Sequence, residues 1–177
     1  MDIHVDTEFT SLSDPRLIAI GAVAGDTRAF YGIVSDFPKR ACTRFVIEHV
    51  LPALDANPAD ATLPHDDLAR AFCDWLAGLA ASANGSCRLI MDDECDRELV
   101  GRLLLRGNWS DAHIDAAISQ RRLSAEDNSL PLFERYFELN PDRRRHNALD
   151  DARAASSSSK CNAVEGIAED FQRCSIA

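Results

Sequence analysis

The stretch Val5-Asp6-Thr7-Glu8-Phe9-Thr10 has the alternation of a β-strand and follows an apolar start at Ile3. Side chains two residues apart on a strand point to the same face, so Asp6 and Glu8 are predicted to lie side by side. One divalent cation could bridge two carboxylates placed in this way. The segment is therefore predicted to be the first strand of the fold and one half of a metal site.

Two more strands are predicted directly after the first. The runs 17–24 and 29–34 are apolar, and turn-forming residues precede each of them at Ser13-Asp14-Pro15 and Gly25-Asp26-Thr27. Three consecutive strands joined by short turns form an antiparallel meander. The compact apolar run Arg88–Met91 predicts a further, buried strand that lies parallel to the first.

Helices are predicted for most of the remaining chain, because apolar residues recur there at helical spacing. The predicted helical ranges are 45–54, 68–79, 99–104, 129–139 and a helix that begins at Ala148. A loop is predicted at 57–60 and a helix stop at 84–86. The predicted fold class is α/β, with a mixed sheet of the antiparallel three-strand meander plus parallel strands, flanked by helices.

Length and composition predict one domain over residues 1–177. The chain is 46% hydrophobic, which is enough for one well-buried core. The serines at 156–159 are poor helix formers and interrupt the last helical stretch. Two interpretations stay open after about residue 155: a continuous helix, or a linker to a last helix over 163–171.

The formal net charge of −10 argues against a protein that coats long duplexes through counterion release. It leaves nucleic acid open as a partner, because bound metal ions would reverse the field that a phosphate meets. The first residues have no basic or apolar leader pattern, and no long apolar run follows, so we expect a cytoplasmic protein with no membrane partner. The six cysteines lack zinc-like spacing and are expected to be reduced thiols.

The segment His146-Asn147-Ala148-Leu149-Asp150-Asp151-Ala152 could bring a base and a further carboxylate to the first strand. Hydrolysis needs a group that takes a proton from water, and a histidine with a pKa near neutrality can do this. Asp150 is expected to face away from the metals if Asp151 faces them, because one residue turns a helical side chain by about 100°.

Together these segments resemble the histidine-containing branch (DEDDh) of the DEDD superfamily of 3′-to-5′ exonucleases. The resemblance rests on Asp6-Thr7-Glu8, an aspartate that opens a helix after a central strand, and His-x-Ala-x-x-Asp at 146–151. The Asp-Thr-Glu-Phe start, the meander and His-Val-Leu-Pro at 49–52 are similar to stand-alone exoribonucleases of the RNase AS type. The resemblance covers almost the whole chain. It implies an RNase H-like fold and release of nucleoside 5′-monophosphates from the 3′ end of single-stranded RNA.

The resemblance also implies roles for individual residues. Asp6, Glu8, a central aspartate and Asp151 would hold two Mg²⁺ ions, for which Mn²⁺ can substitute, and His146 would be the general base. Three aspartates lie where the family has its central one: Asp92, Asp93 and Asp96. Asp96 is preferred, because Asp96-Arg97-Glu98-Leu99-Val100 fits the family pattern, and the other two are expected to cap the helix or face solvent.

Substrate contacts are expected from two segments. Phe9-Thr10-Ser11-Leu12 resembles the family segment that meets the terminal ribose and supports the last base, with Phe9 as a packing residue and Leu12 as a wedge. Arg145 is expected to hold a substrate phosphate just before the proposed base. Relatives of this kind often form homodimers, so a homodimer is expected here too.

Two alternatives remain. Exonucleases that proofread or repair single-stranded DNA share these motifs, and no residue in the sequence identifies a contact to a 2′-hydroxyl. A non-catalytic nucleic-acid-binding module on the same fold is the other alternative, although such a module would be expected to have lost some of the metal ligands.

Overall fold

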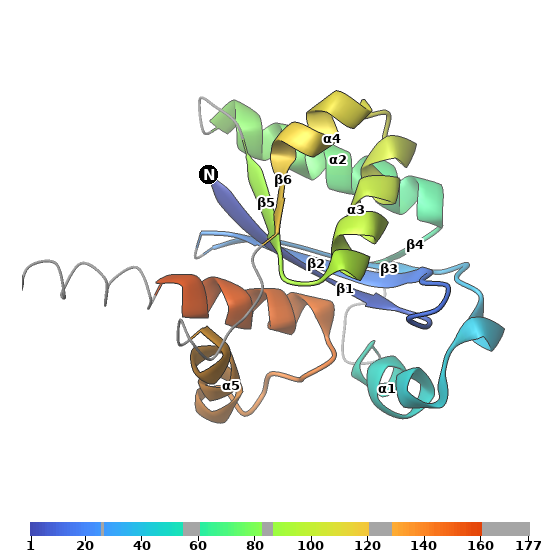
Figure 1. Ribbon diagram of the computed structural model, residues 1–177, viewed down its shortest axis with the longest axis vertical. Coiled ribbons are helices and arrows are strands. Elements are labelled where there is room, and N and C mark those ends of the chain that lie inside the picture. Colours follow the sequence, from blue (N-terminus) through green and yellow to red (C-terminus); the bar gives the residue numbers. More distant parts are fainter. Residues whose placement is uncertain (26, 55–60, 83–86, 121–128, 161–177) are drawn as a thin grey trace, which may run out of the picture.

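The computed structural model describes residues 1–25, 27–54, 61–82, 87–120 and 129–160. Within these ranges, six strands form one sheet in the order β4-β3-β2-β1-β5-β6, and helices lie on both of its faces (Figure 1). The strands are β1 (Asp2–Phe9), β2 (Leu17–Ala24), β3 (Arg28–Val34), β4 (Thr62–Leu63), β5 (Arg88–Met91) and β6 (Ile118–Gln120).

The sheet combines antiparallel and parallel pairing. β1, β2 and β3 form the predicted antiparallel meander, and β5 lies parallel to β1 as predicted. β4 is parallel to β3, and β6 is parallel to β5. The protein therefore has an RNase H-like α/β fold, and the predicted fold class is confirmed.

Each predicted helical range is helical in the structure as far as it is described: the π-helix η2 (Val46–Val50) and the α-helices α1 (Leu51–Leu54), α2 (His65–Ser82), α3 (Glu94–Arg106) and α5 (Ser129–Leu139). The 3₁₀ turn η1 (Lys39–Ala41) and the α-helix α4 (Asp111–Ala117) were not predicted. A further helix, here called the C-terminal helix, covers residues 148–160. Among the described residues, no helix is both long and apolar enough to cross a membrane.

The C-terminal helix continues through the serines at 156–159, so the first of the two open interpretations holds as far as residue 160. Ser156 and Ser158 are buried, and the Ser158 hydroxyl donates a hydrogen bond to the carbonyl of Ala155. That bond satisfies a buried hydroxyl within the helix itself. The predicted loop at 57–60, the predicted helix stop at 84–86 and the predicted helix at 163–171 lie outside the described residues.

Two hydrophobic clusters hold the layers together. β2 is buried along its whole length, as expected for a strand covered on both faces. On one face α2 and α3 bury a cluster that includes Phe72 and Leu103. On the other face Ala148 of the C-terminal helix packs in a smaller cluster with Val50. The strand that carries Asp6 therefore lies between α3 and the C-terminal helix.

Candidate metal centre

β1 positions the first two carboxylates by simple alternation. Ile3 and Val5 point into the core beneath α2 and α3, so Asp6 and Glu8 point to the opposite face. Glu8 is buried, whereas Asp6 keeps some exposed surface. The predicted proximity of the two carboxylates is present in the structure.

The C-terminal helix lies against the face of the sheet that carries Asp6 and so brings Asp151 close to it. The helix can lie there because β2 has a glycine, Gly21, where the helix crosses the strand. Gly21 pairs with Asp6 in the sheet. A Cβ atom at residue 21 would lie 2.2 Å from the backbone nitrogen of Leu149 and 2.3 Å from the carbonyl carbon of Ala148. Only a residue without a side chain lets the helix rest this closely on the strand.

Asn147 begins the C-terminal helix. Its side-chain oxygen accepts a hydrogen bond of 3.3 Å from the backbone nitrogen of Asp150, which is the usual role of an N-cap asparagine. The Asp150 carboxylate bonds to Arg143 and Arg153 and belongs to neither metal-type cluster described below. Asp150 thus pairs with arginines rather than with the cluster that contains Asp151, and that it faces away from bound metals stays a prediction.

α3 positions the central aspartates at its N-terminus. Asp93 is the N-cap and accepts a hydrogen bond of 2.7 Å from the backbone nitrogen of Cys95, so its predicted capping role is confirmed. Asp96 is buried, and one of its carboxylate oxygens accepts bonds from both the backbone nitrogen and the hydroxyl of Thr7. Thr7 thus ties the start of α3 to β1, a contact that sequence reasoning missed.

The carboxylates gather in two triads that share Asp6. One triad contains Asp6, Glu8 and Asp151, and the other contains Asp6, Asp92 and Asp96. Within each triad, ligand oxygens from the three residues all lie within 4.8 Å of one another. Asp92 was expected to cap the helix or face solvent, and this expectation is wrong, because the turn between β5 and α3 places it beside Asp96.

Burial and mutual repulsion raise the pKa values of these carboxyl groups. Burial is the main cause in each case, and it raises the pKa of Glu8 to about 8 and those of Asp96 and Asp151 to about 7. The pKa of Asp6 is also raised, first by burial and then by the charges of Asp96 and Asp151. A divalent cation would reverse this penalty, because it favours the ionised form of every carboxylate around it.

One oxygen of the cluster also lacks a partner. The Oδ1 atom of Asp151 is buried and accepts no hydrogen bond from any described residue. Its nearest ion-pair partner is the Arg145 Nε atom at 3.8 Å. A buried carboxylate oxygen without a hydrogen bond is uncommon and fits a position reserved for a ligand. The buried acidic residues of the two triads could therefore hold a metal ion.

His146 lies beside the cluster in an unusual backbone conformation. Its φ angle is +62°, and its backbone nitrogen donates a hydrogen bond of 2.9 Å to Asp151 Oδ2. Non-glycine residues rarely adopt positive φ, and such residues often occur at functional sites. The imidazole is half-buried, and burial, followed by Arg145 and His49, lowers its pKa. The ring is therefore neutral at pH 7 and able to accept a proton.

An aromatic side chain and a second histidine pack against His146. The Phe45 ring meets the His146 ring edge-on with centroids 5.0 Å apart, and the His49 ring lies 6.4 Å from His146. Phe45 is 51% exposed. Sequence reasoning placed Phe45 and His49 on the apolar stripe of a helix and gave neither a role at the site. The sequence did hold one indication that they act together, because residues four apart on a helix lie on the same face.

Arg145 is held in place by its neighbours. Its guanidinium group bonds to Glu134 and lies over the rings of Phe133 and Phe137, with its central carbon 5.0 and 5.5 Å from their centroids. Cation–π contacts of this kind restrain the side chain. Arg145 is therefore restrained beside Asp151, with its Nε atom 3.8 Å from Asp151 Oδ1.

The hairpin loop after β1 offers Leu12 to solvent. Leu12 is 78% exposed, whereas Phe9 packs against the core. Thr10 is fully buried, and its hydroxyl group accepts a hydrogen bond of 3.2 Å from the backbone nitrogen of Arg16. Thr10 thus closes the loop, and Leu12 is the exposed residue of the segment Phe9–Leu12.

No protein-family model and no curated protein sequence matches this chain. What the chain does must therefore be inferred from its residues and from the geometry of this site.

Proposed function

We propose that the protein is a metal-dependent 3′-to-5′ exoribonuclease that releases nucleoside 5′-monophosphates from the 3′ end of single-stranded RNA. The observation that carries the proposal is the pair of carboxylate triads that share Asp6, with His146 beside them, where its backbone nitrogen donates a hydrogen bond to Asp151. Two such triads are the arrangement expected of a two-metal phosphodiester hydrolase.

The residues fit hard divalent cations. All five members of the triads offer carboxylate oxygens, which are the preferred ligands of Mg²⁺ and Mn²⁺. Asp6, Glu8 and Asp151 would hold one ion, and Asp6, Asp92 and Asp96 would hold the other. When bound, such ions lower the pKa of water and stabilise the negative charge that develops on a phosphate and its leaving oxygen.

The protein's own groups would supply the remaining chemistry. The His146 imidazole would accept the proton of the attacking water, since its pKa is lowered and the ring is uncharged at pH 7. The contact with Phe45 limits the rotation of that ring, and the backbone bond to Asp151 fixes the position of the residue. Thr7 would keep Asp96 oriented toward its triad.

Two further residues would position the substrate. The Arg145 guanidinium, restrained over two aromatic rings, would contact a backbone phosphate next to the scissile bond. The exposed Leu12 side chain would pack against the terminal base. The choice of a 3′ end is supported by the resemblance of the three sequence motifs to the DEDDh exonucleases. The choice of RNA is supported by the similarity of the Asp-Thr-Glu-Phe start, the meander and His-Val-Leu-Pro at 49–52 to exoribonucleases of the RNase AS type.

A time course with 5′-labelled oligonucleotides tests the proposal. With Mg²⁺ or Mn²⁺, single-stranded RNA should shorten in steps of one nucleotide and release nucleoside 5′-monophosphates, and EDTA should stop the reaction. Asp151→Asn should still bind the RNA and hardly cleave it, whereas the matched change Asp93→Asn, in the exposed cap, should cleave normally.

Other results would contradict parts of the proposal. Faster shortening of matched single-stranded DNA would indicate a DNA exonuclease. RNA binding without any product in Mg²⁺ or Mn²⁺ would indicate a non-catalytic binding module. Near-normal turnover by Asp151→Asn would remove the assignment of the metal centre.

A further inference from the structure

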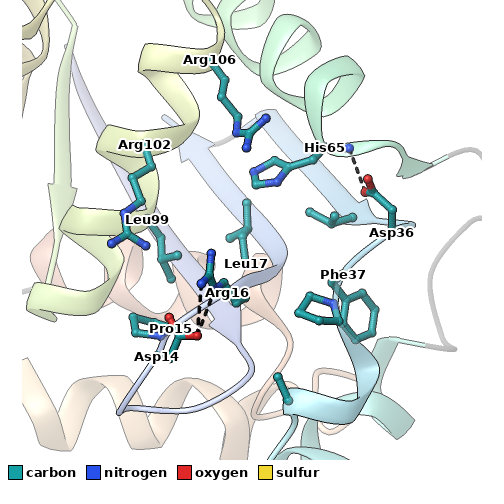
Figure 2. A pocket seen from close by; sticks show the side chains of 13 residues that line it. Asp14, Pro15, Arg16, Leu17, Asp36, Phe37, His65, Leu99, Arg102 and Arg106 are labelled. Atoms are coloured by element: carbon teal, nitrogen blue, oxygen red, sulfur yellow. Dashed lines mark hydrogen bonds and ion pairs between the residues drawn. The ribbon is translucent and has the colours of Figure 1, made fainter.

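A cavity separate from the carboxylate triads lies on the α2 and α3 side of the sheet (Figure 2). Its volume is about 450 Å³, and it is enclosed by the loop before β2, the segment after β3, the start of α2 and one side of α3. Of the described residues that line it, none belongs to either carboxylate triad. The size is in the range of small-molecule binding sites.

Three arginines from two separate elements line this cavity. Arg16 comes from the hairpin loop, and Arg102 and Arg106 come from α3, where they share one side of the helix with Leu99. Figure 2 shows Arg106 extending toward His65 and Arg16 paired with Asp14. Three of the chain's 19 basic residues thus gather at one cavity, each beside a carboxylate: Asp14, Glu98 and Asp66.

The arginines are free to exchange their present partners. Arg16, Arg102 and Arg106 each form one ion pair, and both side chains of every pair are about half exposed or more. Exposed pairs of this kind contribute little to stability, so a ligand with greater charge can replace them. A phosphate group, which accepts paired hydrogen bonds from guanidinium groups, has the required chemistry.

The rest of the lining suits a flat, partly polar molecule. Pro15, Leu17, Phe37 and Leu99 form apolar walls, on which the face of a nucleobase can pack. Asp36 stands at the rim, where its carboxylate already accepts a hydrogen bond of 3.0 Å from the backbone nitrogen of His65. A carboxylate at such a place can also accept hydrogen bonds from ribose hydroxyls or from a base amino group.

We propose that this cavity is a nucleotide-binding site that takes a nucleoside 5′-monophosphate. Arg16, Arg102 and Arg106 contact the phosphate, the apolar walls contact the base, and Asp36 contacts the sugar or the base edge. The site is separate from the carboxylate cluster, and its occupation needs neither a metal ion nor catalysis, so it can be tested independently of the proposed function.

The test is isothermal titration calorimetry of the full chain in EDTA, with each of the four nucleoside 5′-monophosphates. At least one should bind, and Arg102→Ala or Arg16→Ala should weaken that binding by about tenfold or more. Arg97→Ala is the matched control, because Arg97 lies on the same helix in an exposed ion pair with Glu94 and does not line the cavity. Asp6→Asn should bind as the wild type does.

Three outcomes would overturn the proposal. One is the absence of binding at millimolar nucleotide. Another is binding that is lost in Asp6→Asn but kept in Arg16→Ala and Arg102→Ala, which would place the nucleotide at the metal centre. The third is an effect of the arginine variants on the affinity for single-stranded RNA alone, which would make the cavity a contact for strand phosphates. Equal melting temperatures of the ligand-free variants would show that folding is intact.

Discussion

Replacing Asp6 by asparagine tests the shared carboxylate directly, because it removes one charge from both triads with almost no change of shape. Ligand oxygens in each triad lie within 4.8 Å of one another. Two full charges at that distance repel by roughly 3.5 kcal/mol at an effective dielectric constant near 20. Protonation already relieves part of this repulsion, so Asp6→Asn should stabilise the metal-free protein by about 1–3 kcal/mol, or about 3–10 °C in melting temperature.

The free energy of unfolding of the metal-free protein should change with pH in one direction. In the metal-free fold the pKa of Glu8 is about 8 and those of Asp96 and Asp151 are about 7, all above the values of an unfolded chain. The folded state therefore binds more protons, and the free energy of unfolding should fall as pH rises from about 4 to about 8. Asp6→Asn should make this fall shallower.

Thermal denaturation in EDTA and in Mg²⁺, at pH 5.5 and pH 7.5, measures both effects. Mg²⁺ should raise the melting temperature of the wild type, more at the higher pH, and should hardly affect Asp6→Asn. Asp93→Asn is the matched control, because Asp93 is an N-cap and asparagine caps helices equally well. A lower melting temperature of Asp6→Asn in EDTA, together with a normal response to Mg²⁺, would refute the shared-ligand geometry.

Three further predictions concern the residues that support the site. Gly21→Ala forces a Cβ atom into the backbone of the C-terminal helix, so it should cost about 3 kcal/mol, and an unchanged melting temperature would contradict the packing described. Thr7→Val removes the hydroxyl that orients Asp96 and should lower Mg²⁺-dependent activity by roughly 10–100-fold, whereas wild-type turnover would show that this bond is dispensable. At saturating Mg²⁺, the acid limb of kcat/KM should lie below the ordinary pKa of histidine, because burial lowers the pKa of His146 and keeps its ring neutral to lower pH. Phe45→Ala should shift this limb to higher pH by exposing the ring, and an unmoved pH profile would argue against His146 as the base.

Elements with long apolar patterns could be predicted from the sequence. The bounds of β2 and β5 and the existence of α2, α3 and α5 follow from patterns that extend over several residues. β4, β6 and α4 were missed, since two or three paired residues, or two helical turns, are too short for a period to be recognised. The pairing of β4 with β3 and of β6 with β5 depends on the tertiary path of the chain.

The candidate site also has a part that could be predicted from the sequence and a part that could not. The proximity of Asp6 and Glu8 follows from strand geometry alone, and alternation predicted it. The membership of Asp92 depends on the turn between β5 and α3, and the bond from Thr7 to Asp96 joins residues 89 positions apart. Contacts over such separations leave no local pattern in a single sequence. The expected homodimer, cytoplasmic location and preference for RNA remain predictions.

A crystal structure grown or soaked with Mn²⁺, with the ions located by anomalous scattering, tests the metal centre most directly. The triads predict two Mn²⁺ ions per chain, one contacting Glu8 and Asp151, the other contacting Asp92 and Asp96, and both contacting Asp6. A single ion, ions that do not contact Asp6, or no ion at saturating Mn²⁺ would contradict the proposed two-metal centre.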